Sequence, residues 1–344
     1  MQPNLVNRLR NLLTLPKRAR PPVGATPHAV VHREGSWKLL HYFSPQIPTV
    51  RHPLLLVPSL INRHYVLDLT PGKSFIEYMV GKGFDVYCID WGSPAPEDRF
   101  VTFDQVVDQA IGRAVRVCET TSKLKKVHLF GYCMGGTLAA IYAALHPDKV
   151  QSLTAVAAPV AFDRAGMMAD WLRAGHFNIN AMVDATGVVP ASLLQASFQL
   201  LRPTLPLAKG VNLIDRAWND KFLDGFLALE TWANDNVGLP GEFYRRYVSD
   251  LYQADGLANK NLVVSGHKVD LAAIAAPVLA VTFGFDSIAP AASCEPLLQW
   301  SHSARKEHVV FDGSHIGGMT SSPAAKTLWP QLSSLLAQFD YDPA

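Results

Sequence analysis

Cysteine is scarce in this sequence, and its spacing argues against two kinds of cross-linked fold. The 344 residues include four cysteines, Cys88, Cys118, Cys133 and Cys294. No pair has the Cys-x-x-Cys spacing, and no cysteine has the histidine spacing of structural zinc sites. Neither a disulfide framework nor a metal site is indicated. We therefore expect a reducing compartment, the cytoplasm, and no bound metal.

Charge and long apolar runs are also limited. Charged residues make up 17% of the chain, the net charge is +2, and no basic cluster interleaved with aromatics occurs beyond the extreme N-terminus. Nucleic acid is therefore not an expected partner. Residues 1–22 lack the apolar core of a signal peptide, and no run reaches the roughly 18 apolar residues of a membrane span. We expect a chain that is neither secreted nor membrane-spanning.

The hydrophobic residues, 49% of the chain, follow strand-like and helix-like patterns in alternation. Strands are expected at 29–43 as a hairpin, then at 52–60, 84–92, 125–133 and 150–162. Helices are expected at 72–83, 103–121 and 135–147. This alternation predicts a mostly parallel sheet that helices cover on both faces.

The alternation is interrupted once, between residues 163 and 270. This stretch is helix-like, aromatic and punctuated by proline and glycine, and we interpret it as an inserted cap. Strand patterns return at 276–286 and 307–315, and a helix is expected at 323–339. The predicted organisation is an N-terminal segment (1–27), a core built from 28–162 and 271–344, and a cap subdomain (163–270).

One short motif carries the chemistry. Residues 131–135 read GYCMG, between an apolar strand and a helix rich in small residues, which is the setting of a nucleophile elbow. The helix N-terminus favours a thiolate at Cys133, and the Met134 backbone N–H points to where an oxyanion would develop. The alternative interpretation is a buried cysteine in a glycine-rich turn. The other three cysteines lack this context.

An acid and a histidine follow the elbow in the order that such a fold requires. Asp286 ends the strand pattern at 276–286, and His315 ends the next one. Both therefore open on the same edge of the sheet as Cys133. We expect His315 to act as general base and Asp286 to orient it or to share that role. Asp312 is an alternative partner for His315, although it is better explained as a turn former.

A second oxyanion donor is expected from the loop after residues 52–60. Ile61 or Leu60 is the predicted source, and a plain connecting loop is the alternative. A thiol nucleophile under an apolar cap favours transfer of an acyl group over its hydrolysis, because water is kept from the intermediate. Hydrolases with a cysteine nucleophile remain compatible with the same motif.

These segments together resemble a known family. The GYCMGGT box at 131–137, the segment 57–99, the cap exit at 240–253, and the acid and histidine regions at 269–290 and 313–319 are similar to the catalytic subunit of polyhydroxyalkanoate synthases. The resemblance is to the short type that works with a second subunit and has the α/β-hydrolase fold. It extends from about residue 4 to the C-terminus.

The resemblance implies an acyltransferase that polymerises (R)-3-hydroxyacyl-CoA and releases coenzyme A. Cys133 would carry the polyester as a thioester, His315 would be the base for the thiol, and Asp286 would help to activate the incoming 3-hydroxyl. The family uses no metal or redox cofactor, since the coenzyme A thioester is itself the substrate. It also implies a second synthase subunit, a homodimer through the cap, and cytoplasmic polymer granules.

Three positions depart from the family pattern. Ser287 stands where histidine usually follows the acid, and Ser314 where glycine often precedes the catalytic histidine. The cap exit ends in Ala254 and Asp255, where the family usually has an asparagine at the second position. These departures bear on substrate range and activity, but none removes a proposed catalytic atom.

Two other functions are compatible with the sequence: a cysteine-dependent thioesterase of the same fold, and a binding protein associated with granules that has lost catalysis. The intact Cys133, Asp286 and His315 argue against the second. Near the N-terminus, Leu5 and Leu9 lie at helical spacing beside basic residues. That segment is expected to dock on a partner subunit or polymer surface, or to pack on the protein's own sheet.

Overall fold

A single large sheet organises the computed structural model, which describes residues 3–43, 48–173, 175–201, 203 and 205–341. Within these residues eight strands lie in the order β1-β2-β4-β3-β5-β6-β11-β12. Strands β1 and β2 form the predicted antiparallel hairpin, β2 pairs antiparallel with β4, and the strands from β4 to β12 are parallel. The strands are β1 (His28–Glu34), β2 (Trp37–Tyr42), β3 (Leu54–Val57), β4 (Val86–Asp90), β5 (Val127–Tyr132), β6 (Val150–Val156), β11 (Val278–Phe283) and β12 (Lys306–Phe311).

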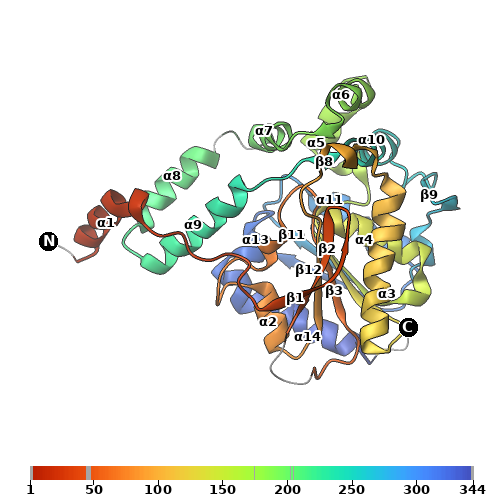
Figure 1. The fold of residues 1–344 in the computed structure, drawn as a ribbon, viewed down its shortest axis with the longest axis horizontal. Helices are drawn as coiled ribbons and strands as arrows, with labels where there is room; N and C mark the ends of the chain where they lie inside the picture. The colour runs from red at the N-terminus through yellow and green to blue at the C-terminus, as the bar shows by residue number, and fades with distance from the viewer. Residues whose placement is uncertain (1–2, 44–47, 174, 202, 204, 342–344) are drawn as a thin grey trace.

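Helices cover both faces of this sheet, as the alternating pattern predicted (Figure 1). One face packs on α2 (Phe75–Gly81) and α14 (Trp329–Phe339), and the other packs on α3 (Ile111–Ser122) and α4 (Met134–Leu145). The central strands are buried along their whole length because apolar side chains face a helix layer on each side. Short helices connect the last strands: α11 (Ala291–Cys294), α12 (Pro296–Trp300) and α13 (Gly317–Thr320).

The segment predicted as a cap leaves the sheet after β6 and rejoins it at β11. Its elements are α5 (Met167–Leu172), α6 (Ile179–Thr186), β7 (Val188–Val189), α7 (Ala191–Leu201), α8 (Leu205–Arg216), α9 (Asp220–Asn234), β8 (Leu239–Pro240), α10 (Gly241–Arg246), β9 (Val263–Val264) and β10 (His267–Lys268). Strands β7 and β8 pair antiparallel as a separate two-stranded sheet. Every helix in the described part of the chain is too short or too polar to cross a membrane.

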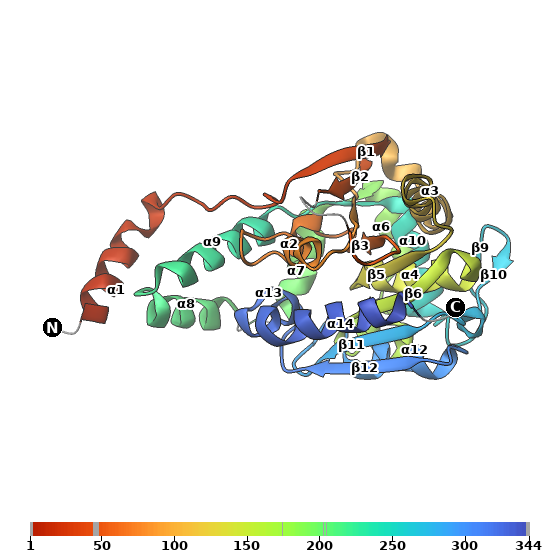
Figure 2. The ribbon, with the colours of Figure 1, turned by 90° about the horizontal axis from the view of Figure 1, so that it is seen from below.

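An arm of three helices projects from the body of the molecule. It consists of α1 (Pro3–Thr14), α8 and α9, and both views show it pointing away from the sheet (Figures 1 and 2). Just after α1 in the chain, Arg18 forms ion pairs with Asp220 (2.7 Å) and Asp224 (2.8 Å) of α9. Helix α1 itself packs on α8, and Asn11 Nδ2 donates to Ala217 O at 2.8 Å, so the alternative that this helix packs on the protein's own sheet is wrong.

A buried polar cluster ties the C-terminal end of the chain to the base of the sheet. Asp340 Oδ1 lies 2.7 Å from His52 Nδ1 and 3.2 Å from Nε2 of His128, a residue of β5. The backbone N–H groups of Arg51 and His52 donate to the same carboxylate, and His128 Nδ1 lies 2.8 Å from Ser152 Oγ. Burial opposes the charged carboxylate, but these hydrogen bonds outweigh it and lower the pKa of Asp340.

We predict that Asp340→Asn lowers the free energy of unfolding by about 2 kcal/mol at neutral pH, because its amide group would face a donating N–H. The pH dependence follows from two lowered pKa values. Burial lowers the pKa of His128, although Asp340 partly offsets it. Because the pKa of His128 is lowered, the fold is most stable above about pH 6.5 and loses stability as the pH falls, whereas the contribution of Asp340 is lost only below about pH 4. Urea unfolding from pH 7.5 to 3 measures both effects, and the exposed Asp215→Asn is the control. Equal stability of the two variants at pH 7 would contradict the role of the cluster.

Candidate active site

Cys133 occupies the strained turn that the sequence predicts. It lies between β5 and α4 with φ 56° and ψ −131°, a backbone conformation that side chains other than glycine rarely adopt. Its N–H donates to Val156 O (2.9 Å), which anchors the turn to the neighbouring strand. Of the four cysteines it is the one that is not fully buried. Burial raises the pKa of Cys88, Cys118 and Cys294, so these three thiols stay protonated.

The glycines around Cys133 are required by close backbone contacts. A Cβ on Gly131 would collide with the backbone of Gly136, and a Cβ on Gly135 would collide with the carbonyl oxygen of Val57 in β3. A Cβ on Gly136 would overlap the side chain of Ala158. Helix α4 can therefore begin this close to the sheet only because these positions have no side chain, which confirms the prediction for the turn.

His315 and Asp286 meet at the carboxyl edge of the sheet, as the order of the motifs predicted. Asp286 follows β11, His315 follows β12, and His315 Nδ1 lies 2.6 Å from Asp286 Oδ2. Asp312 is not the partner that the structure pairs with His315. Both oxygens of Asp286 are occupied, since Oδ1 accepts from the N–H groups of Ile288 and Ala289, each at 2.9 Å. The Asp286 side chain has no solvent exposure.

The charge state of His315 follows from its neighbours. Burial disfavours the imidazolium, but the adjacent Cys133 sulfur and the hydrogen bonds to Asp286 and Cys133 outweigh burial and raise the pKa of His315 to about 10. His315 is then protonated at neutral pH, and its positive charge lies beside the sulfur of Cys133. This arrangement is ready for nucleophilic attack on an acyl group.

Sequence reasoning missed a second tether on the histidine. The Tyr132 hydroxyl donates to the backbone carbonyl of His315 at 2.7 Å, and the two rings stack with centroids 5.5 Å apart. Tyr132 therefore fixes the backbone that carries the imidazole, while Asp286 fixes the ring. The only signal in the sequence was an aromatic residue next to the nucleophile, and it says nothing about a partner 183 positions away.

The two predicted oxyanion donors lie beside the nucleophile. Met134 is the first residue of α4, where the backbone N–H groups have no partner within the helix. The Ile61 side chain lines the same cavity as Cys133, and its N–H donates to Ser59 Oγ at 3.3 Å. A role for either N–H in binding an oxyanion stays a prediction. Leu60 lines a different cavity.

The cap encloses a largely apolar space above the nucleophile, which we call the catalytic cavity. Its volume is about 170 Å³. The core contributes Cys133, Met134 and Ile61, and most of the wall comes from the cap: Met168, Trp171, Leu172, Phe177, Met182, Val189, Leu193, Leu194, Ser197, Phe198, Tyr244, Tyr247 and Tyr252. Many of the aromatic residues noted in the sequence of the cap therefore surround the reacting group.

Two of the three departures from the family pattern, Asp255 and Ser314, form hydrogen bonds within their loops. Asp255 Oδ1 accepts from the N–H of Phe162 at 2.9 Å, which an asparagine oxygen in that place would also do. Asp255 has φ 43°, and Asp shares with Asn a tolerance for this region. Ser314 Oγ accepts from the N–H of Gly317, the first residue of the short helix α13, at 3.3 Å. Ser287 follows Asp286 on the loop beyond β11.

Comparison with known proteins defines the class first. Residues 52–322 match the family model of the alpha/beta hydrolase fold. Solved structures agree: the monoacylglycerol lipase of Paleococcus ferrophilus aligns with a TM-score of 0.56 at 18% identity, over 89% of this chain and 100% of that one. An esterase from Thermogutta terrifontis gives 0.55 at 16% identity, over 91% and 99%. The fold is that of the α/β-hydrolases.

The family within that class is equally clear. Residues 21–79 match the model of the poly-beta-hydroxybutyrate polymerase (PhaC) N-terminus. Poly(3-hydroxyalkanoate) polymerase subunits PhaC of Allochromatium vinosum and Thiocystis violacea are 33% and 32% identical to this chain, over 91% of it and 89% and 88% of their own lengths. The Haloferax mediterranei subunit is 36% identical over 92% of this chain, which spans 65% of that relative. The chain belongs to the poly(3-hydroxyalkanoate) polymerase family, which confirms the resemblance.

The protonated state of His315 gives a direct test of the site. We predict that His315→Gln slows the alkylation of Cys133 by iodoacetamide at least tenfold at pH 6.5, because the variant loses the positive charge that lies beside the sulfur. Mass spectrometry of the peptide that carries Cys133 measures the rate. Equal rates in the two proteins at pH 6.5 would contradict this role of the His315 charge.

Proposed function

We propose that this chain polymerises (R)-3-hydroxyacyl-CoA thioesters into polyhydroxyalkanoate and releases coenzyme A. The observation that carries the proposal is a Cys133–His315–Asp286 array beneath an apolar, capped cavity. Membership of the polymerase family supports it. The proposed chemistry uses only groups of the chain and the thioester itself, with no metal or redox cofactor. We further propose that the product collects as granules in the cytoplasm.

The first half of the proposed cycle loads the enzyme. The Cys133 thiolate attacks the thioester carbonyl, and the oxyanion that forms faces the Met134 N–H. The carbon–sulfur bond to coenzyme A then breaks, and the leaving thiolate takes the proton that His315 carries. One thioester replaces another, so the acyl group remains reactive.

The second half lengthens the chain. The hydroxyl of one hydroxyacyl unit attacks the acyl–Cys133 carbonyl, His315 takes the hydroxyl proton, and an ester bond forms as the thiolate leaves. Asp286 supports this step as a positioning residue, because both its oxygens are engaged and its side chain is sealed from the cavity. Its buried position argues against direct activation of the substrate hydroxyl, the role that the resemblance implied. His315 is then the general base.

The alternative function is a cysteine-dependent thioesterase, and the two functions differ in the acceptor. The lining of the catalytic cavity favours transfer to a hydroxyl, because its walls are mostly aliphatic and aromatic and offer few groups that would hold a water molecule near Cys133. The shared elbow does not separate the two functions.

Purified chain, with and without its presumed second subunit, is incubated with 3-hydroxybutyryl-CoA. We expect the release of coenzyme A to accompany the formation of insoluble polymer. In Cys133→Ala we expect the rates of both to fall at least a thousandfold. Cys118→Ala, which removes a buried thiol of α3 outside the site, is the matched control. Free 3-hydroxybutyrate without polymer would establish a thioesterase instead. If neither this thioester nor longer ones are turned over in a reaction that depends on Cys133, the chain is a binding protein.

We also propose that the arm is where the second subunit binds. Leu207, Val211 and Ile214 form an exposed apolar stripe along α8, and Leu207 is 73% exposed. Leu9 and Leu13 of α1 continue the apolar surface, with Leu13 81% exposed. The first 20 residues carry five basic side chains and no acidic one, so an acidic amphipathic helix is the complementary partner. The relatives' description as polymerase subunits supports the existence of a second subunit.

Val211→Asp tests this surface, because it places a charge in the stripe without touching the active site. We expect it to weaken the complex with the second subunit at least tenfold, while the neighbouring exposed Asn212→Asp leaves it unchanged. Light scattering on each protein, alone and mixed, gives the assembly state. If the unmixed chain is a dimer that Val211→Asp dissociates, the stripe is a homodimer contact, which is the other assembly that family resemblance implies. An intact complex in Val211→Asp would contradict the proposal.

A further inference from the structure

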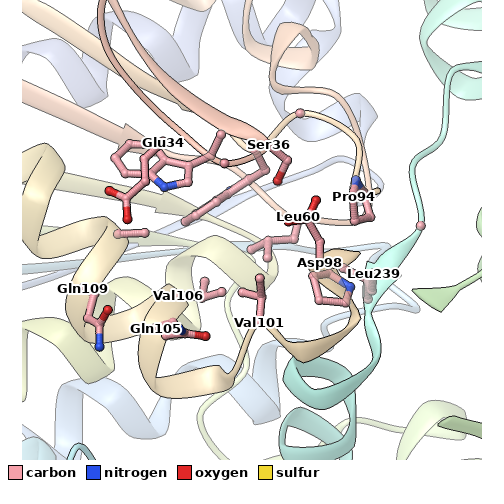
Figure 3. Close-up of a pocket in the computed structure, with 17 residues that line it drawn as sticks. Glu34, Ser36, Leu60, Pro94, Asp98, Val101, Gln105, Val106, Gln109 and Leu239 are labelled. Carbon is pink, nitrogen blue, oxygen red and sulfur yellow. The ribbon is translucent and has the colours of Figure 1, made fainter. Parts of the chain in front are cut away.

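A second cavity, which we call the side cavity, lies next to the catalytic one and has no part in the reaction described so far. Its volume is about 140 Å³ (Figure 3). Figure 3 shows Glu34 and Gln109 on one side and Pro94 and Leu239 on the opposite side, with Leu60 between them. The hairpin turn of β1 and β2, the loop after β4, the helical segment Gln105–Ala110 just before α3 and the cap strand β8 all contribute to its wall.

The lining of the side cavity has a definite chemistry. Its inner part is apolar and includes Trp37, Leu60 and Leu239, all of them buried. Gln105 and Gln109 are exposed side chains of its wall, and Gln105 Oε1 accepts from the N–H of Thr102 at 2.8 Å, which leaves its NH₂ group to donate. The amide groups suit a ligand that carries carbonyl oxygens.

The charges of the side cavity exclude one class of ligand. The residues that line it, within the described chain, include the carboxylates Glu34 and Asp98 and no lysine or arginine. Arg113 is nearby, but it is paired with Glu34 at 2.6 Å. An anion such as the phosphates of coenzyme A would meet negative charge here and no free cation among these residues. The side cavity therefore fits a neutral ligand.

Only a thin partition separates the two cavities. Val189 of β7 lines the catalytic cavity, whereas its strand partner Leu239 of β8 lines the side cavity. Likewise Ile61 faces the catalytic cavity and Leu60 the side cavity. The N–H of Val237 donates to Ile61 O at 3.3 Å, so the loop and the cap strand form one continuous wall.

We propose that the side cavity binds a segment of the polyester chain that the enzyme makes. This inference rests on the proposed function. A polyester of hydroxyacyl units is neutral, its short alkyl branches suit the indole and leucine surfaces, and its ester carbonyls accept from the glutamine amides. A chain attached to Cys133 is held close by, so its effective concentration at the side cavity is high and a modest intrinsic affinity is enough.

The test blocks the catalytic cavity first and then probes the side cavity. Cys133 is alkylated with N-benzylmaleimide, which fills the catalytic cavity, and binding of a methyl-capped tetramer of 3-hydroxybutyrate is followed by calorimetry. We expect the alkylated chain to bind the tetramer. Gln109→Trp, which places a large side chain in the wall, weakens binding at least tenfold. Thr120→Trp, at an exposed position in the helix α3 that follows, changes the affinity for the tetramer less than twofold.

Three results would overturn the inference: no binding by the alkylated chain, equal binding by Gln109→Trp, or displacement of the tetramer by coenzyme A. Thermal unfolding of each variant confirms that it is folded. Polymer synthesis by the unalkylated chain separates this inference from the proposed function. If the unalkylated chain makes polymer but the alkylated chain does not bind the tetramer, the side cavity does not bind polyester and the proposed polymerase activity still stands. If no turnover depends on Cys133, the proposed polymerase activity is wrong.

Discussion

The close approach of α4 to the sheet is the constraint on which the site depends. It requires three positions without side chains around Cys133, and it holds the cysteine in a backbone conformation that an isolated chain would avoid. The same approach brings the start of α4, with the Met134 N–H and the positive end of the helix dipole, next to Cys133. The hydrogen bond from Cys133 to β6 and the packed strands on either side provide the free energy that keeps this turn strained.

His315 depends on that turn in two ways. Its imidazole is held by Asp286 and by the sulfur of Cys133, and its backbone is held by Tyr132, the residue immediately before the nucleophile. The segment that carries Cys133 therefore also holds the backbone of His315 through Tyr132, although 182 positions separate Cys133 from His315 in sequence. The cap completes the site by replacing water with aromatic and aliphatic side chains, which is the condition under which a thioester intermediate can wait for a hydroxyl.

The core of the fold and the meeting of Cys133, Asp286 and His315 at one edge of the sheet were predictable because each left a local signal. The alternation of apolar patterns gave the strands, and glycines at fixed offsets marked Cys133. The position of Asp286 and His315 at the ends of successive strands placed them on one edge of the sheet. The contacts of Tyr132, the packing of α1 on the cap and the side cavity were not predictable, because each depends on segments far apart in the chain whose pairing no local pattern encodes. Ile61 illustrates the limit: the loop was identified, but which N–H would face an oxyanion depends on how Ser59 and the cap strand hold it.

The central claim is that Cys133 passes its acyl group to a hydroxyl and not to water. Rapid mixing with 3-hydroxybutyryl-CoA, acid quenching and mass spectrometry of the peptide that carries Cys133 test it most directly. The account predicts a ladder of masses on Cys133, separated by single hydroxybutyryl units, that lengthens with reaction time. A single acyl unit that decays to free acid, or a ladder attached to another residue, would contradict it.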